Sequence, residues 1–126
     1  MKLGEAIFLV DELKPNQIER ARKIEWLSRL DERIFDELMC THQGGPDVPE
    51  EFLGYDQATD PDTELLAKAP YDEMYRFYLE MHIDRTNLEN DKYNDDAAMF
   101  NDLWGQYARK YHREHRPLVG QLTHRF

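Results

Sequence analysis

The sequence predicts an all-α domain, a small bundle of about four helices with one long acidic loop. Two observations lead to this prediction. Prolines and glycines divide the 126 residues into segments suited to one small domain. Within the segments, apolar side chains recur at steps of three or four, which places them on one side of a helix. The clearest such stripe contains Tyr93, Ala97, Phe100, Trp104, Tyr107 and Tyr111.

The first two helices are predicted at residues 3–13 and 17–41. The short N-terminal helix is expected to stop at Lys14, because a residue that precedes a proline avoids the helical region. Asn16 is placed to cap the long helix, and Glu19 lies three residues later, as in a capping box. The apolar face of the long helix contains Ile24, Leu27, Ile34 and Leu38.

An acidic loop is predicted at residues 43–63, after Gly44-Gly45-Pro46. Residues 43–64, Glu64 included, contain seven acids and no Lys or Arg. A loop of this length in a small domain is commonly functional or disordered. Phe52 and Tyr55 could anchor it to the core or to a partner. For residues 63–66, an extended piece and a helical turn both fit the sequence.

A helical hairpin is predicted at residues 71–115. Its first helix, to about Asn90, is apolar on more than one side and is therefore expected to pack on more than one side. Its second helix is expected to begin at a cap, Asn94 or Asp95, and to end near His115. The aromatic stripe of that helix must be covered by the rest of the chain or by another copy.

The net charge of −10 argues against DNA or RNA binding as the main task, because such binding needs cations that release counterions. The charge is uneven: residues 109–126 hold five cations against one acid, so they carry +4 and residues 1–108 carry −14. We predict a domain at 1–115 and a basic C-terminal tail at 116–126. These cations could contact an acidic surface such as a second copy, or only complement a helix dipole.

The cysteine count and the N-terminus favour a cytosol-like compartment. Cys40 is the only cysteine, so no intrachain disulfide is possible. The apolar run at residues 1–10 is too short to span a membrane, and Glu5 interrupts it. We therefore expect no signal peptide and no membrane partner.

No pattern of residues predicts an enzyme or a bound cofactor. Glu80, His82 and Asp84 are two residues apart on a helix and point in different directions. His112 and His115 can share a face, but no third or fourth metal ligand is evident. Cys40 and His42 lack an orienting group, and Cys40 is interpreted as a small apolar filler. We expect no catalytic, cofactor or metal site.

Several strings, taken in order, resemble small all-helical head–tail connector (adaptor) proteins of tailed phages and prophages. They are DELKPN at 11–16, IEWLSRLD at 24–31, DPDTELL at 60–66, APYDEMY at 69–75, and YN at 93–94 followed by AAMFN at 97–101. The resemblance covers most of residues 3–115 and implies a structural virion protein, made in the bacterial cytoplasm. It implies a ring between portal and tail proteins, contacts between copies, and no catalytic residues.

The predicted partner contacts lie in the acidic loop and the basic end: Phe52, Tyr55, Asp60, Asp62, Arg109, Arg113 and Arg116. An alternative function is a small prophage-encoded regulatory module that masks a host protein with its acidic surface. A third hypothesis is a metal-dependent enzyme that uses His112, His115 and nearby acids.

Overall fold

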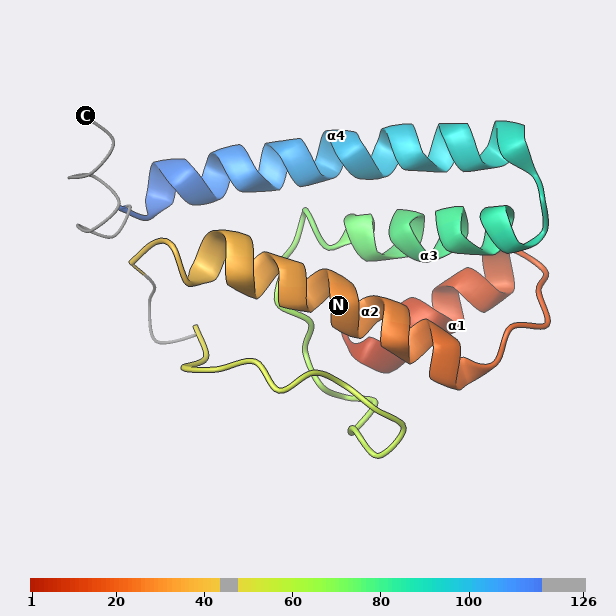
Figure 1. The fold of residues 1–126 in the computed structure, drawn as a ribbon, viewed down its shortest axis with the longest axis horizontal. Coiled ribbons are helices and arrows are strands. Elements are labelled where there is room, and N and C mark those ends of the chain that lie inside the picture. Colours follow the sequence, from red (N-terminus) through yellow and green to blue (C-terminus); the bar gives the residue numbers. More distant parts are fainter. Residues whose placement is uncertain (44–47, 117–126) are drawn as a thin grey trace.

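The computed structural model describes residues 1–43 and 48–116, and it is all-helical (Figure 1). Its four α-helices are α1 (Leu3–Leu13), α2 (Arg20–Ile34), α3 (Glu73–Thr86) and α4 (Asn90–Glu114). A π-helical turn, η1 (Phe35–Met39), continues α2. The prediction of a small all-α bundle is confirmed.

Helix α3 lies at the centre of the fold. It forms an antiparallel hairpin with α4, and its other sides contact α1 and α2 (Figure 1). It is therefore packed on more than one side, as its apolar pattern predicted. The longer α4 extends past the start of α3 and contacts η1. This overhanging end of α4 forms one wall of the site described below.

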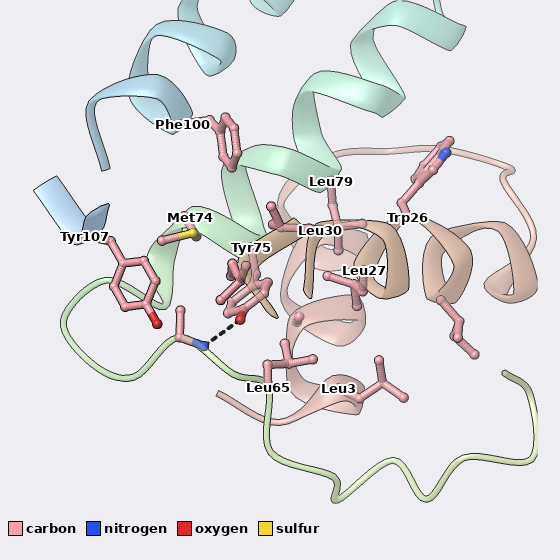
Figure 2. Packing of buried hydrophobic residues seen from close by; sticks show 14 of the residues in the cluster. Leu3, Trp26, Leu27, Leu30, Leu65, Met74, Tyr75, Leu79, Phe100 and Tyr107 are labelled. Carbon is pink, nitrogen blue, oxygen red and sulfur yellow. Dashed lines mark hydrogen bonds between the residues drawn. The ribbon is translucent and has the colours of Figure 1, made fainter. Parts of the chain in front are cut away.

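The core joins α1, α2, α3 and the connection that precedes α3 (Figure 2). Leu3, Leu27, Leu65 and Leu79 are all fully buried in it. Full burial of one such side chain stabilises the fold by about 1.5–3 kcal/mol. Three members of the predicted aromatic stripe, Phe100, Tyr107 and Tyr111, are buried, whereas Tyr93, Ala97 and Trp104 are only partly covered.

The long helix is shorter than predicted, and its start differs. Helix α2 begins at Arg20 rather than at residue 17, with Glu19 at the N-cap position and no side-chain cap. The Asn16 Oδ1 atom instead accepts a hydrogen bond from the Ile18 amide at 3.1 Å. Asn16 thus closes a turn before the helix, because its short side chain can bond its own backbone two residues on.

The predicted cap of the second hairpin helix is also wrong. Helix α4 begins at Asn90, and Leu88 makes the preceding turn with a φ of 60°. The polar residues 90–96 do not interrupt the helix, because most of them lie on its solvent-exposed side. At the other end of the hairpin, α3 begins at Glu73 instead of Tyr71.

Residues 63–66 are extended and pair with the N-terminus. The Leu3 amide donates to the Thr63 carbonyl at 2.9 Å, and the Leu65 amide donates to the Met1 carbonyl at 3.0 Å. Beside this pairing the chain approaches Gly4 so closely that an added Cβ would lie 3.0 Å from the Pro61 Cβ. The extended alternative is therefore the correct one.

The predicted boundaries at 43–63 and 116–126 are only partly covered by the structure. Residues 44–47 and 117–126 lie outside the described residues, so of the predicted basic tail only Arg116 is placed.

Candidate functional site

Two side chains anchor the acidic segment, residues 48–64, to the helices. The Tyr55 hydroxyl donates to the Asp31 Oδ2 atom at 2.5 Å, and the Tyr55 amide donates to the Ser28 Oγ atom at 2.9 Å. The Phe52 ring centroid lies 6.3 Å from that of Phe35. Both residues were predicted to contact the core or a partner. The structure shows the contact with the core, and a partner contact stays a prediction.

The acids of this segment form an exposed negative surface. Its members are Glu50, Glu51, Asp56, Asp60 and Asp62, and within the described ranges none of them forms an ion pair. Two of them also shape the chain: the Oδ1 atoms of Asp56 and Asp60 accept hydrogen bonds from the Ala58 and Asp62 amides at 2.8 and 2.9 Å. We call these five acids the acidic surface.

Arg109, Arg113 and Arg116 form an exposed basic surface at the C-terminal end of α4. None of the three is in an ion pair with another described residue. Figure 1 shows residues 50–62 running along the edge of the molecule opposite α4. The two ends of the acidic segment, at Val48 and Glu64, instead lie beside this end of α4. The two surfaces therefore do not neutralise each other within one copy.

A pocket of about 500 Å³ lies between η1, the start of the acidic segment, the connection before α3 and the C-terminal half of α4. We call it the α4 pocket. Its lining is mainly apolar, with ionisable side chains in its walls: Met39, Val48, Pro49, Glu64, Leu65, Leu66, Lys68, Ala69, Tyr71, Tyr107, Lys110, Tyr111, Glu114 and His115. Two members of the predicted aromatic stripe, Tyr107 and Tyr111, thus line this pocket while remaining largely covered by the described chain.

Tyr111, one of the residues that line this pocket, has a hydroxyl that is closed off from solvent and not satisfied. Its hydroxyl is buried and has no hydrogen-bond partner among the described residues, while its ring stacks on His115 at a centroid distance of 3.8 Å. Burial raises the pKa of Tyr111, so the group is a neutral phenol that can donate a hydrogen bond. A buried donor without an acceptor is destabilising.

Asp31 is a fully buried carboxylate that holds three parts of the chain together. It accepts hydrogen bonds from the hydroxyls of Tyr55 and Tyr75, each at 2.5 Å, and from the Leu66 amide at 3.1 Å. The Tyr75 hydroxyl also accepts a hydrogen bond from the Ala67 amide at 2.7 Å, which is drawn in Figure 2. Burial raises the pKa of Asp31, and these donors oppose the rise. The hydrogen bonds of Asp31 therefore hold the fold together.

His42 and His112 form a contact that the sequence did not reveal. The buried His42 ring donates from Nδ1 to the Leu38 carbonyl at 2.7 Å, which leaves its Nε2 atom as an acceptor. The Nδ1 atom of His112 lies 2.7 Å from that Nε2 atom and donates to it. His112 was expected at a solvated helix end. It is exposed, but it also ties α4 to the residues after η1.

A second buried ionic group joins the ends of three helices. Lys14 pairs with Asp84, and its Nζ atom lies 3.1 Å from the Asp96 Oδ2 atom. Burial and the neighbouring Asp96 carboxyl raise the pKa of Asp84 to about 6, while Lys14 opposes this rise. All three side chains are at least mostly buried. The group fixes the turn end of the α3–α4 hairpin to the end of α1.

The other candidate residues for chemistry have separate partners. Glu80 pairs with Arg76 at 2.6 Å, and His82 stacks on Trp26 at 4.8 Å. Burial lowers the pKa of His82 to about 4. In residues 1–43 and 48–116, no three His, Cys, Asp or Glu side chains are grouped closely enough to hold a metal ion. Cys40 is exposed, so its interpretation as an apolar filler is wrong.

Comparison with protein-family models, with curated proteins and with solved structures finds no match to this chain. Of the helices in the described residues, none combines the length and apolar character needed to cross a membrane.

Proposed function

We propose that this chain is a structural protein-binding subunit, a head–tail connector of a tailed phage or prophage. The observation that carries the proposal is the pair of exposed, oppositely charged surfaces on different sides of one helical body. When the acidic surface of one copy meets the basic surface of the next, the contact joins two different patches. Such heterologous contacts generate a ring if the rotation between copies closes.

Three further observations support this function. The strings at residues 11–16, 24–31, 60–66, 69–75 and 93–101 resemble those of connector proteins in order and spacing. The buried ionisable groups Asp31, His42 and Asp84 are bonded to other parts of the fold, where they fix the shape of the subunit. A net charge of −10 also suits a wall past which DNA moves without being retained.

The ring would lie between portal and tail proteins, and charge exchange tests how its copies meet. We expect Asp60→Lys with Asp62→Lys, or Arg109→Glu with Arg113→Glu, to weaken assembly about ten-fold or more. A chain that carries both pairs of changes has exchanged its surfaces and regains assembly. The matched control, Glu12→Lys with Glu19→Lys, makes the same charge change at exposed positions outside the acidic segment.

Assembly is measured by sedimentation velocity, alone and with the portal protein of the same phage or prophage. Mass spectrometry of purified virions provides the independent test, in which the chain is expected among the structural proteins. Absence from virions together with no binding to portal would refute the connector proposal. An acidic regulatory module that masks a host protein would then be the function to test.

A further inference from the structure

We propose that Leu53 of one copy inserts into the α4 pocket of a second copy. The contact forms where the acidic surface of the first copy meets the basic surface of the second, so the inference deepens the proposed function and rests on it. It assigns the pocket an occupant of defined chemistry: one aliphatic side chain, carried by a rigid segment with negative charge on both sides of it.

Leu53 is exposed in the middle of a charged surface. Its exposed fraction, 85%, is the highest among the large apolar side chains of residues 1–43 and 48–116. Glu50 and Glu51 precede it and Asp56 follows it, and all three are exposed members of the acidic surface. An apolar side chain in the centre of a polar rim has the layout of a protein-binding site.

The fold holds the residues on both sides of Leu53 against the helices. The Phe52 ring packs on η1, and the Tyr55 hydroxyl donates a hydrogen bond to the buried Asp31 carboxylate. Between them Gly54 has a φ of 83°, a conformation that glycine adopts freely. Leu53 is therefore presented by a backbone whose position is already set, which lowers the entropy lost on binding.

The same attachments keep Leu53 out of the pocket of its own copy. Residues 50–62 run along the edge of the molecule opposite α4, whereas the pocket lies against the C-terminal half of α4 (Figure 1). To enter that pocket, Leu53 would have to break the packing of Phe52 and the hydrogen bond of Tyr55. A second copy can bring its Leu53 to the pocket without any such change.

The α4 pocket suits an uncharged side chain. Apolar and aromatic groups make up most of its lining, and its volume of about 500 Å³ has room for one side chain and the backbone that carries it. Two lysines and two glutamates balance one another in its walls: Lys68, Lys110, Glu64 and Glu114. A balanced lining gives no advantage to a charged group, so an aliphatic side chain is the better occupant.

Charges outside the pocket can orient the two copies. Arg109 and Arg113 flank the pocket residue Lys110 along α4, and both are exposed members of the basic surface. The acids on both sides of Leu53 are attracted to these arginines when a second copy approaches. Such complementarity fixes the register of an interface, and here it directs Leu53 toward the pocket.

The first experiment compares two leucines of nearly equal exposure. Leu53→Ala shortens the proposed anchor, whereas Leu88→Ala makes the same change at a residue that is 83% exposed in the turn between α3 and α4. Both are made in the full chain, and self-association is measured by sedimentation equilibrium. We expect Leu53→Ala to weaken association about ten-fold or more and Leu88→Ala to change it less than about two-fold.

The second experiment locates the contact by cross-linking. Cys40→Ser removes the only cysteine, and two chains are made on this background, one with Leu53→Cys and one, labelled with ¹⁵N, with Lys68→Cys at the exposed wall of the pocket. The chains are mixed with a short bismaleimide, and mass spectrometry identifies the mixed product. Its yield should exceed about five-fold that of the control mixture, in which Leu88→Cys replaces Leu53→Cys.

Each outcome decides the proposal. Equal effects of the two alanine substitutions, or equal yields of the two mixed products, would overturn it. A wild type that stays monomeric up to about 1 mM would also overturn it, because the copies then do not meet. Portal binding and presence in virions decide the connector function separately. If both are absent while the Leu53 contact is found, the connector function is refuted and this contact stands.

Discussion

At Asp31, one buried carboxylate accepts hydrogen bonds from three distant parts of the chain. Tyr55 belongs to the acidic segment, Leu66 to the connection before α3, and Tyr75 to α3 itself. All the donors are uncharged, and hydrogen bonds to an ionised acceptor are stronger than those between neutral groups. Asp31 therefore determines where the acidic segment lies relative to the helices.

Replacement of this carboxylate tests that role. Asp31→Asn puts an amide donor against hydroxyl or amide donors, so we expect the free energy of unfolding to fall by about 2–3 kcal/mol. Urea denaturation measures the change. Asp36→Asn, which removes the same charge at an exposed position of η1, should change stability by less than about 0.5 kcal/mol. Equal effects of the two substitutions would contradict the role assigned to Asp31.

Asp84 predicts a pH dependence of stability. Its pKa in the folded protein, about 6, is above the ordinary 3.8, so the folded state binds a proton that the unfolded state releases. Lowering the pH from 7 through 6 toward 4.5 relieves the cost of burying its charge. Wild type should therefore gain roughly 1–2 kcal/mol relative to Asp84→Asn over this range.

Denaturation of both proteins at pH 7 and pH 4.5 measures this difference, and other titrating groups cancel in the comparison. The control is Asp95→Asn, at an exposed position next to Asp96. Its stability should differ from that of wild type by about the same amount at both pH values. A gain by Asp84→Asn relative to wild type on acidification would contradict the raised pKa.

At the scale of elements, the packing of α3 on three helices gives the bundle most of its cohesion. Leu79 of α3 is fully buried, whereas Leu13, at the end of α1, is 50% exposed. Leu79→Ala leaves a cavity and should cost about 3–4 kcal/mol, while Leu13→Ala should cost less than about 1 kcal/mol. Thermal unfolding of the two variants checks this expectation. Similar losses would show that α3 is not the central element.

The turn between α3 and α4 contains a strained residue. Leu88 has a φ of 60°, which strains the backbone of a residue with a side chain. Its side chain is 83% exposed, so burial does not offset this strain. Leu88→Gly should stabilise the fold by about 0.5–1 kcal/mol, because glycine adopts positive φ freely. Asn87→Gly, at a φ of −85°, should instead destabilise it. The midpoints of urea unfolding distinguish the two results.

The sequence predicted the helices well and their ends poorly. Spacing of apolar residues is a property of the whole segment, so the stripes on α2 and α4 were found. Where a helix starts depends on the local turn that precedes it. Asn16 closes a turn before α2, and Leu88 adopts a left-handed conformation before α4. No local pattern distinguishes these from ordinary caps.

The candidate site was predicted only in part. The charged residues of the acidic and basic surfaces were found because charge asymmetry is visible in the sequence. The contacts of Asp31 with Tyr75 and of His42 with His112 join residues 44 and 70 positions apart, so only the fold brings them together. The α4 pocket likewise forms from four separate segments, and an unsatisfied hydroxyl such as that of Tyr111 has no signature in the sequence.

At the scale of the whole molecule, each copy presents an acidic surface, a basic surface and an open pocket. The two charged surfaces differ from each other, so copies that meet through them form chains or rings instead of closed pairs. Charge attraction of this kind favours encounter and orientation, and it weakens as salt screens it.

Electron cryo-microscopy of the intact virion, or of the portal complex purified with this chain, tests the central claim most directly. We predict density for a closed ring of copies on the portal, with Asp60 and Asp62 of each copy facing Arg109 and Arg113 of the next. Particles in which the portal meets the tail through other proteins, with no density for this chain, would contradict it.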